Sequence, residues 1–265
     1  MKRRGRFSIS TSVFNKAYLK SAWSERDKWA SYERHGFAQF FYLTIAGHLE
    51  AVIAAIVKAR LKSIRHMLKW DELGPMKYTD NGQNHSLAMD PLVTSLTALL
   101  EAQEIEAEHA PIEKLGSFYS RIFSRTVAAV IGKELDQDMQ ALFKLRNLFA
   151  HSRDWYLETD GITQGHRIIL DGNPLQMPAQ RLHAAGIIAN LDFNGNNHSE
   201  LMGHLYSDEA LLHFYDQVIM IENKLRNSVD FLPEKNMLFI TELPDLRAEV
   251  NNQGAGSADA TRPAR

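Results

Sequence analysis

The residues of this chain that are best suited to chemistry lie in one short segment, 144–153, which reads KLRNLFAHSR. Asn147 and His151 are four residues apart, so on a helix their side chains lie on one face. The guanidinium of Arg146 is a permanently charged, planar donor that suits a phosphate group. Histidine titrates near neutral pH and can therefore move a proton. We call Arg146, Asn147 and His151 together the RNxxxH motif.

The position of Arg146 needs a separate argument. It precedes His151 by five residues, which places the two side chains roughly 140° apart on an ideal helix. The long arginine side chain, or a loosened last turn, would bring the guanidinium to the same cleft as the imidazole. The motif is thus expected to work at the end of a helix.

Each motif residue also has a purely structural interpretation. Arg146 could pair with a carboxylate of another helix, and Glu50 is the candidate partner that would orient it. His151 could simply be favoured by the dipole at a helix C-terminus, and Asn147 could face solvent. Taken singly, these interpretations are preferable, but the three residues together at this spacing favour a site.

The elements that must position the motif are helices, and the sequence predicts a mainly α helical bundle. Gly36 is expected to separate the first two helices, 73–83 to be a loop, and the acidic run 101–108 to be a solvated face. Apolar residues at helical spacing predict helices at 12–34, 37–67, 91–108, 112–131, 134–152 and 207–231.

The pattern changes after the motif helix. Asp160-Gly161 separates short segments rich in β-branched and aromatic residues, which is typical of a hairpin. A strand is also expected at 186–193. We therefore predict an N-terminal arm and helix at 1–35, a bundle at 36–152 and 207–232, a β-hairpin or meander insertion at 153–206, and a disordered tail at 251–265.

Composition excludes several classes of protein. The 265 residues include 30 Lys+Arg, 32 Asp+Glu and no cysteine, giving a formal net charge of −2. The lack of cysteine removes disulfides, thiolate zinc sites and cysteine nucleophiles, and the charge gives no strong overall attraction to nucleic acid. The most apolar stretch, 37–61, carries His48, Glu50 and Lys58, so it is a poor membrane span. We expect a cytoplasmic protein with no membrane partner.

The RNxxxH motif resembles the signature of the HEPN superfamily, the higher eukaryotes and prokaryotes nucleotide-binding domains. That signature is an arginine, four to six residues and a histidine, often with asparagine after the arginine, near the end of a helix in a small α-helical bundle. The sequence Asn-Leu-Phe-Ala-His is a familiar variant. Arg60 and His66 also satisfy the bare spacing, without the polar residue, and we interpret that match as chance.

The resemblance implies a metal-independent endoribonuclease without a cofactor. His151 would move the proton at the ribose 2′-OH or the leaving oxygen, Arg146 would stabilise charge on phosphorus, and Asn147 would orient one of them. The products would carry 2′,3′-cyclic phosphate and 5′-OH ends. Lys144 and Arg153 are the basic residues expected to contact RNA, such as tRNA.

The resemblance also implies partners. Family members usually pair, so that two motifs form one cleft, and this chain would need a homodimer because it has one full motif. A toxin or phage-defence effector with an antitoxin partner fits this pattern. The alternative is a non-catalytic module that binds nucleotide, RNA or protein, in which the motif would be occluded or held in internal pairs.

Overall fold

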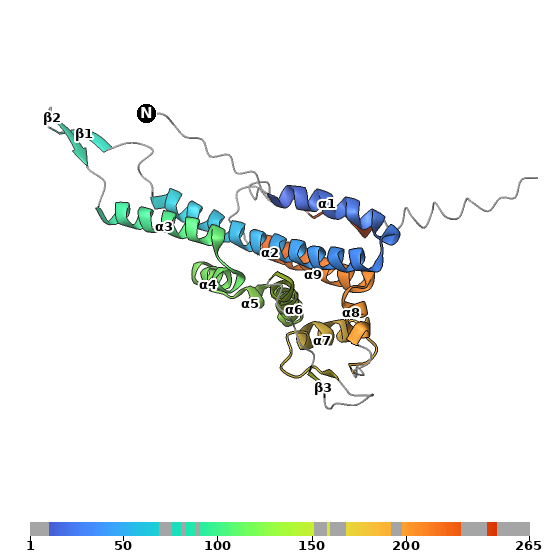
Figure 1. Cartoon of the computed structure of the whole chain (residues 1–265). Helices are drawn as coiled ribbons and strands as arrows, with labels where there is room; N and C mark the ends of the chain where they lie inside the picture. Colours follow the sequence, from blue (N-terminus) through green and yellow to red (C-terminus); the bar gives the residue numbers. More distant parts are fainter. Residues whose placement is uncertain are drawn as a thin grey trace, which may run out of the picture. The chain divides into compact units, whose positions relative to one another are not determined.

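The chain forms a mainly α-helical structure, as its sequence predicts (Figure 1). The computed structural model describes residues 11–68, 76–80, 83–87, 91–150, 158–159, 168–191, 198–228 and 243–247. Its described helices form two compact units. The first unit comprises Met1–His48, Glu134–Met220 and Thr241–Arg265, and the second comprises Leu49–Lys133 and Ile221–Ile240.

The first unit contains the motif helix. Its elements are α1 (Thr11–Glu25), the 3-10 helix η1 (Arg26–Lys28), the first part of α2 (Ser31–Leu68), α6 (Lys133–Ala150), α7 (Gln176–Ala184), α8 (His198–Leu205) and most of α9 (Asp208–Asn227). Apolar side chains from each helix are buried at helical spacing, as expected for amphipathic helices in a bundle. The largest fully buried side chains of this unit are Trp23, Tyr42, Tyr215, Phe41 and Phe214.

The boundary between the first two helices differs from the prediction. Gly36 lies inside α2 and does not separate two helices. The break comes earlier, where α1 ends at Glu25 and η1 follows. Arg26 is buried there, donates from Nη1 to the Trp23 carbonyl at 2.6 Å, and donates from Nε to Asp208 at 2.8 Å. These contacts hold the chain in a tight turn that the sequence analysis does not predict.

The second unit contains the rest of α2, the hairpin of β1 (Met76–Asp80) and β2 (Gln83–Leu87), α3 (Pro91–His109), α4 (Ile112–Phe123), α5 (Val127–Ile131) and the end of α9. The single helix expected at 112–131 is two helices. Ser124 adopts a left-handed conformation with φ 53°, which ends α4. The Thr126 side chain then caps α5 by accepting from the Ala129 amide at 3.1 Å.

The acidic end of α3 is not simply a solvated face. Arg65 of α2 lies 3.3 Å from Glu101 and 2.9 Å from Glu104, and Lys58 lies 3.1 Å from Glu108. The Glu104 side chain is only 15% exposed. The prediction of a solvated face is confirmed for Glu101, Glu106 and Glu108, which are exposed, whereas Glu104 is covered by its pairing with Arg65.

The β1–β2 hairpin is the clearest element that the sequence analysis does not predict. The strands pair antiparallel from Met76↔Leu87 to Asp80↔Gln83. Asn81-Gly82 separates them in the sequence, and this dipeptide is the strongest short hairpin signal. A loop is expected there instead, because the segment 73–83 carries two glycines and one proline.

Where the structure describes the insertion at 153–206, it contains two helices, one short ladder and the turns between them. β3 (Glu158–Thr159) and β4 (Ile168–Ile169) pair antiparallel over two residues each. The helices α7 and α8 occupy much of the remainder. No strand occurs in the described part, 186–191, of the segment where one was expected. The prediction of a strand was therefore wrong for residues 186–191.

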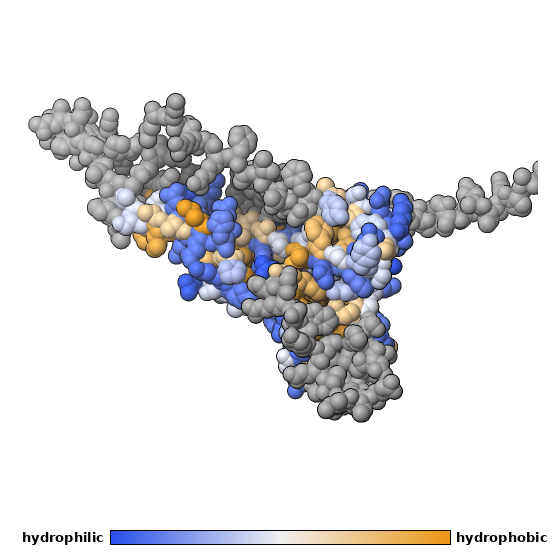
Figure 2. All heavy atoms as spheres, viewed as in Figure 1, coloured by the Kyte–Doolittle hydropathy of each residue, from blue (hydrophilic) through white to orange (hydrophobic). Residues whose placement is uncertain are grey.

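Among the described helices, one is apolar and long enough, by length and composition alone, to cross a membrane. It is Ser31–Arg65 of α2, and 61% of its apolar window is buried inside the structure. A buried core helix has the same properties, and the charged residues Glu50 and Lys58 lie within it. On the visible described surface, apolar residues lie among polar ones (Figure 2). Leu96 and Leu99 of α3 are among the exposed large apolar side chains.

Candidate functional site

The helix α6 positions the motif. Gly132 precedes it with φ 91°, and Glu134 and Asp136 lie in its first turn, where carboxylates stabilise the positive end of the helix dipole. Leu135, Leu142 and Leu145 are buried along one side. The helix ends at Ala150, so Arg146 and Asn147 lie in its last turns.

The described part of the motif is a hydrogen-bonded pair. Arg146 Nη1 donates to Asn147 Oδ1 at 2.9 Å, and both residues are half-buried. This bond holds the guanidinium beside the residue that is i−4 to His151. Lys144 is exposed on the same helix. The structure thus joins the side chains of Arg146 and Asn147 by a hydrogen bond.

The other predicted site residues stay predictions. His151 and Arg153 lie outside the described residues. Glu50 is half-buried in α2 and belongs to the second unit, whereas Arg146 belongs to the first. The pairing of Glu50 with Arg146 therefore remains an expectation from the sequence.

Four aromatic side chains form a series of ring contacts beside the end of α6, and we call them the ring ladder. Tyr42 of α2 stacks on Phe149 of α6 with centroids 5.8 Å apart. Phe149 lies 6.2 Å from Tyr206, which lies 4.7 Å from His35. Tyr42 is fully buried, Phe149 and Tyr206 are half-buried, and His35 is exposed. The ladder therefore leads from the core of the first unit to its surface.

Polar contacts hold the ladder in place. Gln39 Nε2 donates to the Tyr206 hydroxyl at 3.2 Å, and the Tyr42 hydroxyl donates to the Leu205 carbonyl at 2.6 Å. Burial raises the pKa of Tyr42 above its ordinary value, as does the nearby Tyr206. Burial also raises the pKa of Tyr206, against the lowering effect of the bond from Gln39. Both hydroxyls are therefore protonated at neutral pH.

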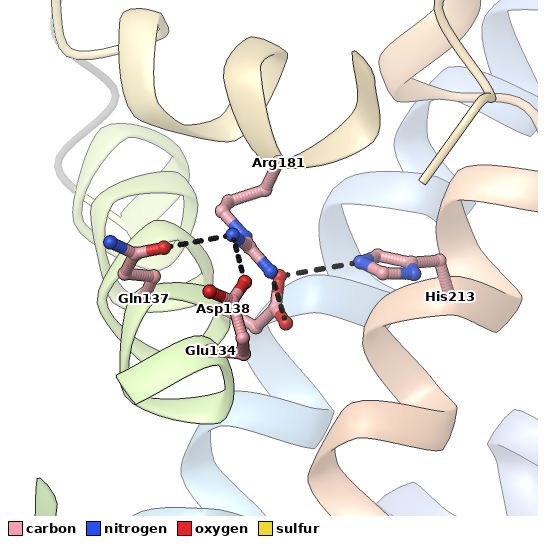
Figure 3. A network of polar contacts seen from close by, with 5 residues as sticks. All are labelled: Glu134, Gln137, Asp138, Arg181 and His213. Carbon is pink, nitrogen blue, oxygen red and sulfur yellow. Dashed lines mark hydrogen bonds and ion pairs between the residues drawn. The ribbon is translucent and has the colours of Figure 1, made fainter. Parts of the chain in front are cut away.

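A second polar cluster lies at the other end of α6 (Figure 3). Asp138, 3% exposed, accepts from Arg181 Nε at 2.7 Å and from Arg181 Nη2 at 3.0 Å. His213 Nε2 of α9 lies 3.4 Å from the same carboxylate. Arg181 also donates to Glu134 at 2.9 Å and to Gln137 at 2.8 Å. This network joins α7 and α9 to the motif helix.

The charge state of the network follows from its contacts. Burial raises the pKa of Asp138, but the hydrogen bonds from His213 and Arg181 and the charge of Arg181 together hold it below its ordinary value. The bond to Asp138 raises the pKa of Arg181. The pair is therefore ionised at neutral pH, and the Arg181 donors are directed at protein carboxylates and an amide rather than outward.

Neither cluster has a local signal in the sequence. The residues that meet at Asp138 come from α6, α7 and α9, and those of the ladder come from α2, α6 and the segment just before α9. Among the described residues, no group of three or more His, Cys, Asp or Glu side chains is placed to hold a metal ion. His204 and Glu200 in α8 lie 4.0 Å apart, as an i,i+4 pair.

Comparison with known proteins adds no relative. No family model matches the chain, and no curated protein or solved structure matches it.

Proposed function

We propose that this protein is a metal-independent endoribonuclease of the HEPN type, with Arg146, Asn147 and His151 as its catalytic residues. The observation that carries the proposal is the bond from Arg146 to Asn147 in the last turns of α6. It orients a guanidinium and an amide together, one turn before the histidine of the motif. The mainly helical bundle around α6 is the setting in which this motif is expected.

The proposed reaction is an internal transesterification. The ribose 2′-oxygen attacks the adjacent phosphorus, the bond from phosphorus to the 5′-oxygen breaks, and the 2′-proton passes to a base while the leaving oxygen gains a proton. His151 performs one of these proton transfers. Arg146 stabilises the negative charge that builds on the phosphoryl oxygens. The products are a 2′,3′-cyclic phosphate and a 5′-OH.

A second candidate function rests on the same bond. Arg146 already donates to the side-chain amide of Asn147. This is the internal pairing that is expected of a motif without catalytic activity. The protein would then bind RNA or nucleotide without cleaving it. The two candidates share the fold and differ in whether RNA is cut.

The test is cleavage of a total RNA pool that includes tRNA, by the purified full chain with EDTA present. We expect the wild type to leave 2′,3′-cyclic phosphate and 5′-OH ends. Arg146→Ala and His151→Ala should each lose at least about a hundredfold in cleavage rate, which is typical when a proton-transfer or charge-stabilising group is removed.

The chain supplies a matched control in its second arginine–histidine spacing. Arg60→Ala and His66→Ala should retain the cleavage rate of the wild type, because that match lacks the polar residue of the motif. Cleavage that survives Arg146→Ala or His151→Ala would overturn the assigned roles. Binding of RNA by a folded protein that never cuts it would favour the non-catalytic module.

A further inference from the structure

The ring ladder has no role in the proposed cleavage, yet it opens to the surface beside the motif. His35, its outer ring, is exposed, and Tyr206 and Phe149 behind it are half-buried. Phe149 follows Arg146 by three residues on α6, so the two side chains are neighbours on the helix surface, with Cβ atoms roughly 5–6 Å apart. A cation and an aromatic surface therefore occur side by side.

We propose that His35 and Tyr206 form a stacking surface for an unpaired nucleobase of the RNA whose phosphate Arg146 contacts. This inference rests on the proposed function, because it assigns the substrate class of the same site. A nucleotide carries a flat ring and an anion on one covalent unit, and proteins bind single strands with aromatic rings beside a positively charged path. Stacking accepts any base. This surface therefore selects single-stranded RNA and does not distinguish one base sequence from another.

The polar atoms around the outer rings fit a base edge. The Tyr206 hydroxyl accepts a hydrogen bond from Gln39 at 3.2 Å, and an accepting hydroxyl still carries a proton that it can donate. Burial keeps that proton on the hydroxyl by raising the pKa of Tyr206. The proposed base stacks on the exposed ring of His35, which lies against the Tyr206 ring, and the Tyr206 hydroxyl is the donor that we assign to its edge.

The inner rings make the outer ones rigid. Tyr206 packs on Phe149, which stacks on the fully buried Tyr42, and the Tyr42 hydroxyl is bonded to the Leu205 carbonyl next to Tyr206. A rigid aromatic surface loses little conformational freedom when a ligand stacks on it. The buried rings thus act as positioning residues for the exposed ones.

The experiment measures binding without cleavage. The probe is a fluorescein-labelled, single-stranded 2′-O-methyl oligouridine, which retains bases and phosphates but lacks the nucleophilic 2′-OH. An abasic oligonucleotide of the same backbone and length is the second probe. Fluorescence anisotropy with the full chain gives the dissociation constant for each probe.

Four variants test the surface. We expect Tyr206→Leu and His35→Ala each to weaken binding of the base-containing probe by about tenfold, and to leave binding of the abasic probe within about twofold of wild type. Tyr206→Phe keeps the ring and should retain most of the affinity. His109→Ala, an exposed histidine at the end of α3, is the matched control and should change neither constant.

The outcomes separate this inference from the proposed function. Equal losses for both probes, no loss for either variant, or no binding of the base-containing probe would overturn the stacking surface, even if the wild type cleaves RNA. Base-dependent binding that these variants weaken would support it, even if the wild type never cleaves RNA and the nuclease proposal fails. If the circular dichroism spectrum shows that Tyr206→Leu does not fold, the test rests on His35→Ala, whose side chain is exposed.

Discussion

At the scale of single residues, Asp138 is a buried carboxylate of the first unit whose charge needs partners. Its side chain is 3% exposed and is held by both nitrogen donors of an Arg181 fork. Removing one partner of such a pair leaves the other charge poorly compensated. Loss of either partner is therefore expected to destabilise the packing of α7 against α6.

Replacement of Asp138 should show this dependence. We expect Asp138→Asn to lower the free energy of unfolding by about 2–4 kcal/mol, because Arg181 then loses the buried one of its two counter-charges and keeps only the exposed Glu134. The measurement is urea denaturation followed by circular dichroism. Asp136→Asn is the matched control on the same helix, because its carboxylate accepts an exposed hydrogen bond from Gln140 at 2.6 Å. A loss as large for Asp136→Asn would argue against a special role for the Asp138 pair.

The same carboxylate predicts how stability depends on pH. The pKa of Asp138 is lower in the folded protein than its ordinary value, so the folded state binds the proton less readily than the unfolded state. The stability from this group is complete above the ordinary pKa, about 4, and is lost as the pH falls through the lower folded value. Below about pH 4 the unfolding free energies of wild type and Asp138→Asn should converge. Curves that stay parallel to acid pH would contradict this assignment.

At the scale of elements, local sequence patterns predicted the features that depend on neighbouring residues, namely helix spans and a helix start. The spans of α3 and α6 agree closely with the prediction, and α9 begins within one residue of its predicted start, where the Ser207 hydroxyl accepts from the Ala210 amide at 3.2 Å. The break between α4 and α5 and the turn at Arg26 were missed. Each depends on a single backbone conformation or a long-range contact, such as Arg26 with Asp208, which periodicity does not encode.

Two glycines give opposite expectations at this scale. Gly47 lies within α2, and a Cβ built there meets nothing within 4 Å. Gly47→Ala should therefore raise the free energy of unfolding by roughly 0.5–1 kcal/mol. Gly132 has φ +91° just before α6, so Gly132→Ala should lower it by about 1 kcal/mol or more. Urea denaturation measures both, and a shift of the same sign in both variants would contradict the backbone argument.

The candidate site was only partly predictable, because contacts between distant parts of the chain are not encoded in local sequence patterns. The spacing predicts that Asn147 and His151 share a helix face, and His151 lies outside the described residues. The bond between the adjacent residues Arg146 and Asn147 is seen only in the structure. The ring ladder joins His35, Phe149 and Tyr206 from distant parts of the chain. Aromatic residues are usually core residues, so without the fold nothing separated these rings from other buried ones.

At the scale of the whole molecule, the charge balance constrains how RNA can be held. The formal net charge is −2, so attraction must come from a local group of cations rather than from the overall field. Lys144 is exposed on α6, and Arg153 follows the motif in the sequence. These two residues, with Arg146, are the basic group that we propose.

Salt dependence tests that group. Reversing Lys144 and Arg153 to Glu should weaken RNA binding and reduce the slope of log K against log salt concentration by roughly one for each phosphate that is no longer neutralised. Lys20→Glu, an exposed lysine on α1, makes the same change of charge at a single position and should leave the slope unchanged. A slope that survives the double reversal would move the RNA path to another surface.

Pairing of two chains gives the most discriminating test of a composite site. If one cleft needs a motif from each chain, a wild-type chain is active only beside a wild-type partner. When His151→Ala is coexpressed in excess, so that wild type is about a tenth of all chains, random pairing leaves about a tenth of wild-type chains in wild-type dimers. Cleavage per wild-type chain should fall about tenfold. Cleavage that stays proportional to the amount of wild type would show that each chain carries a complete site, and that the homodimer is not needed for the chemistry.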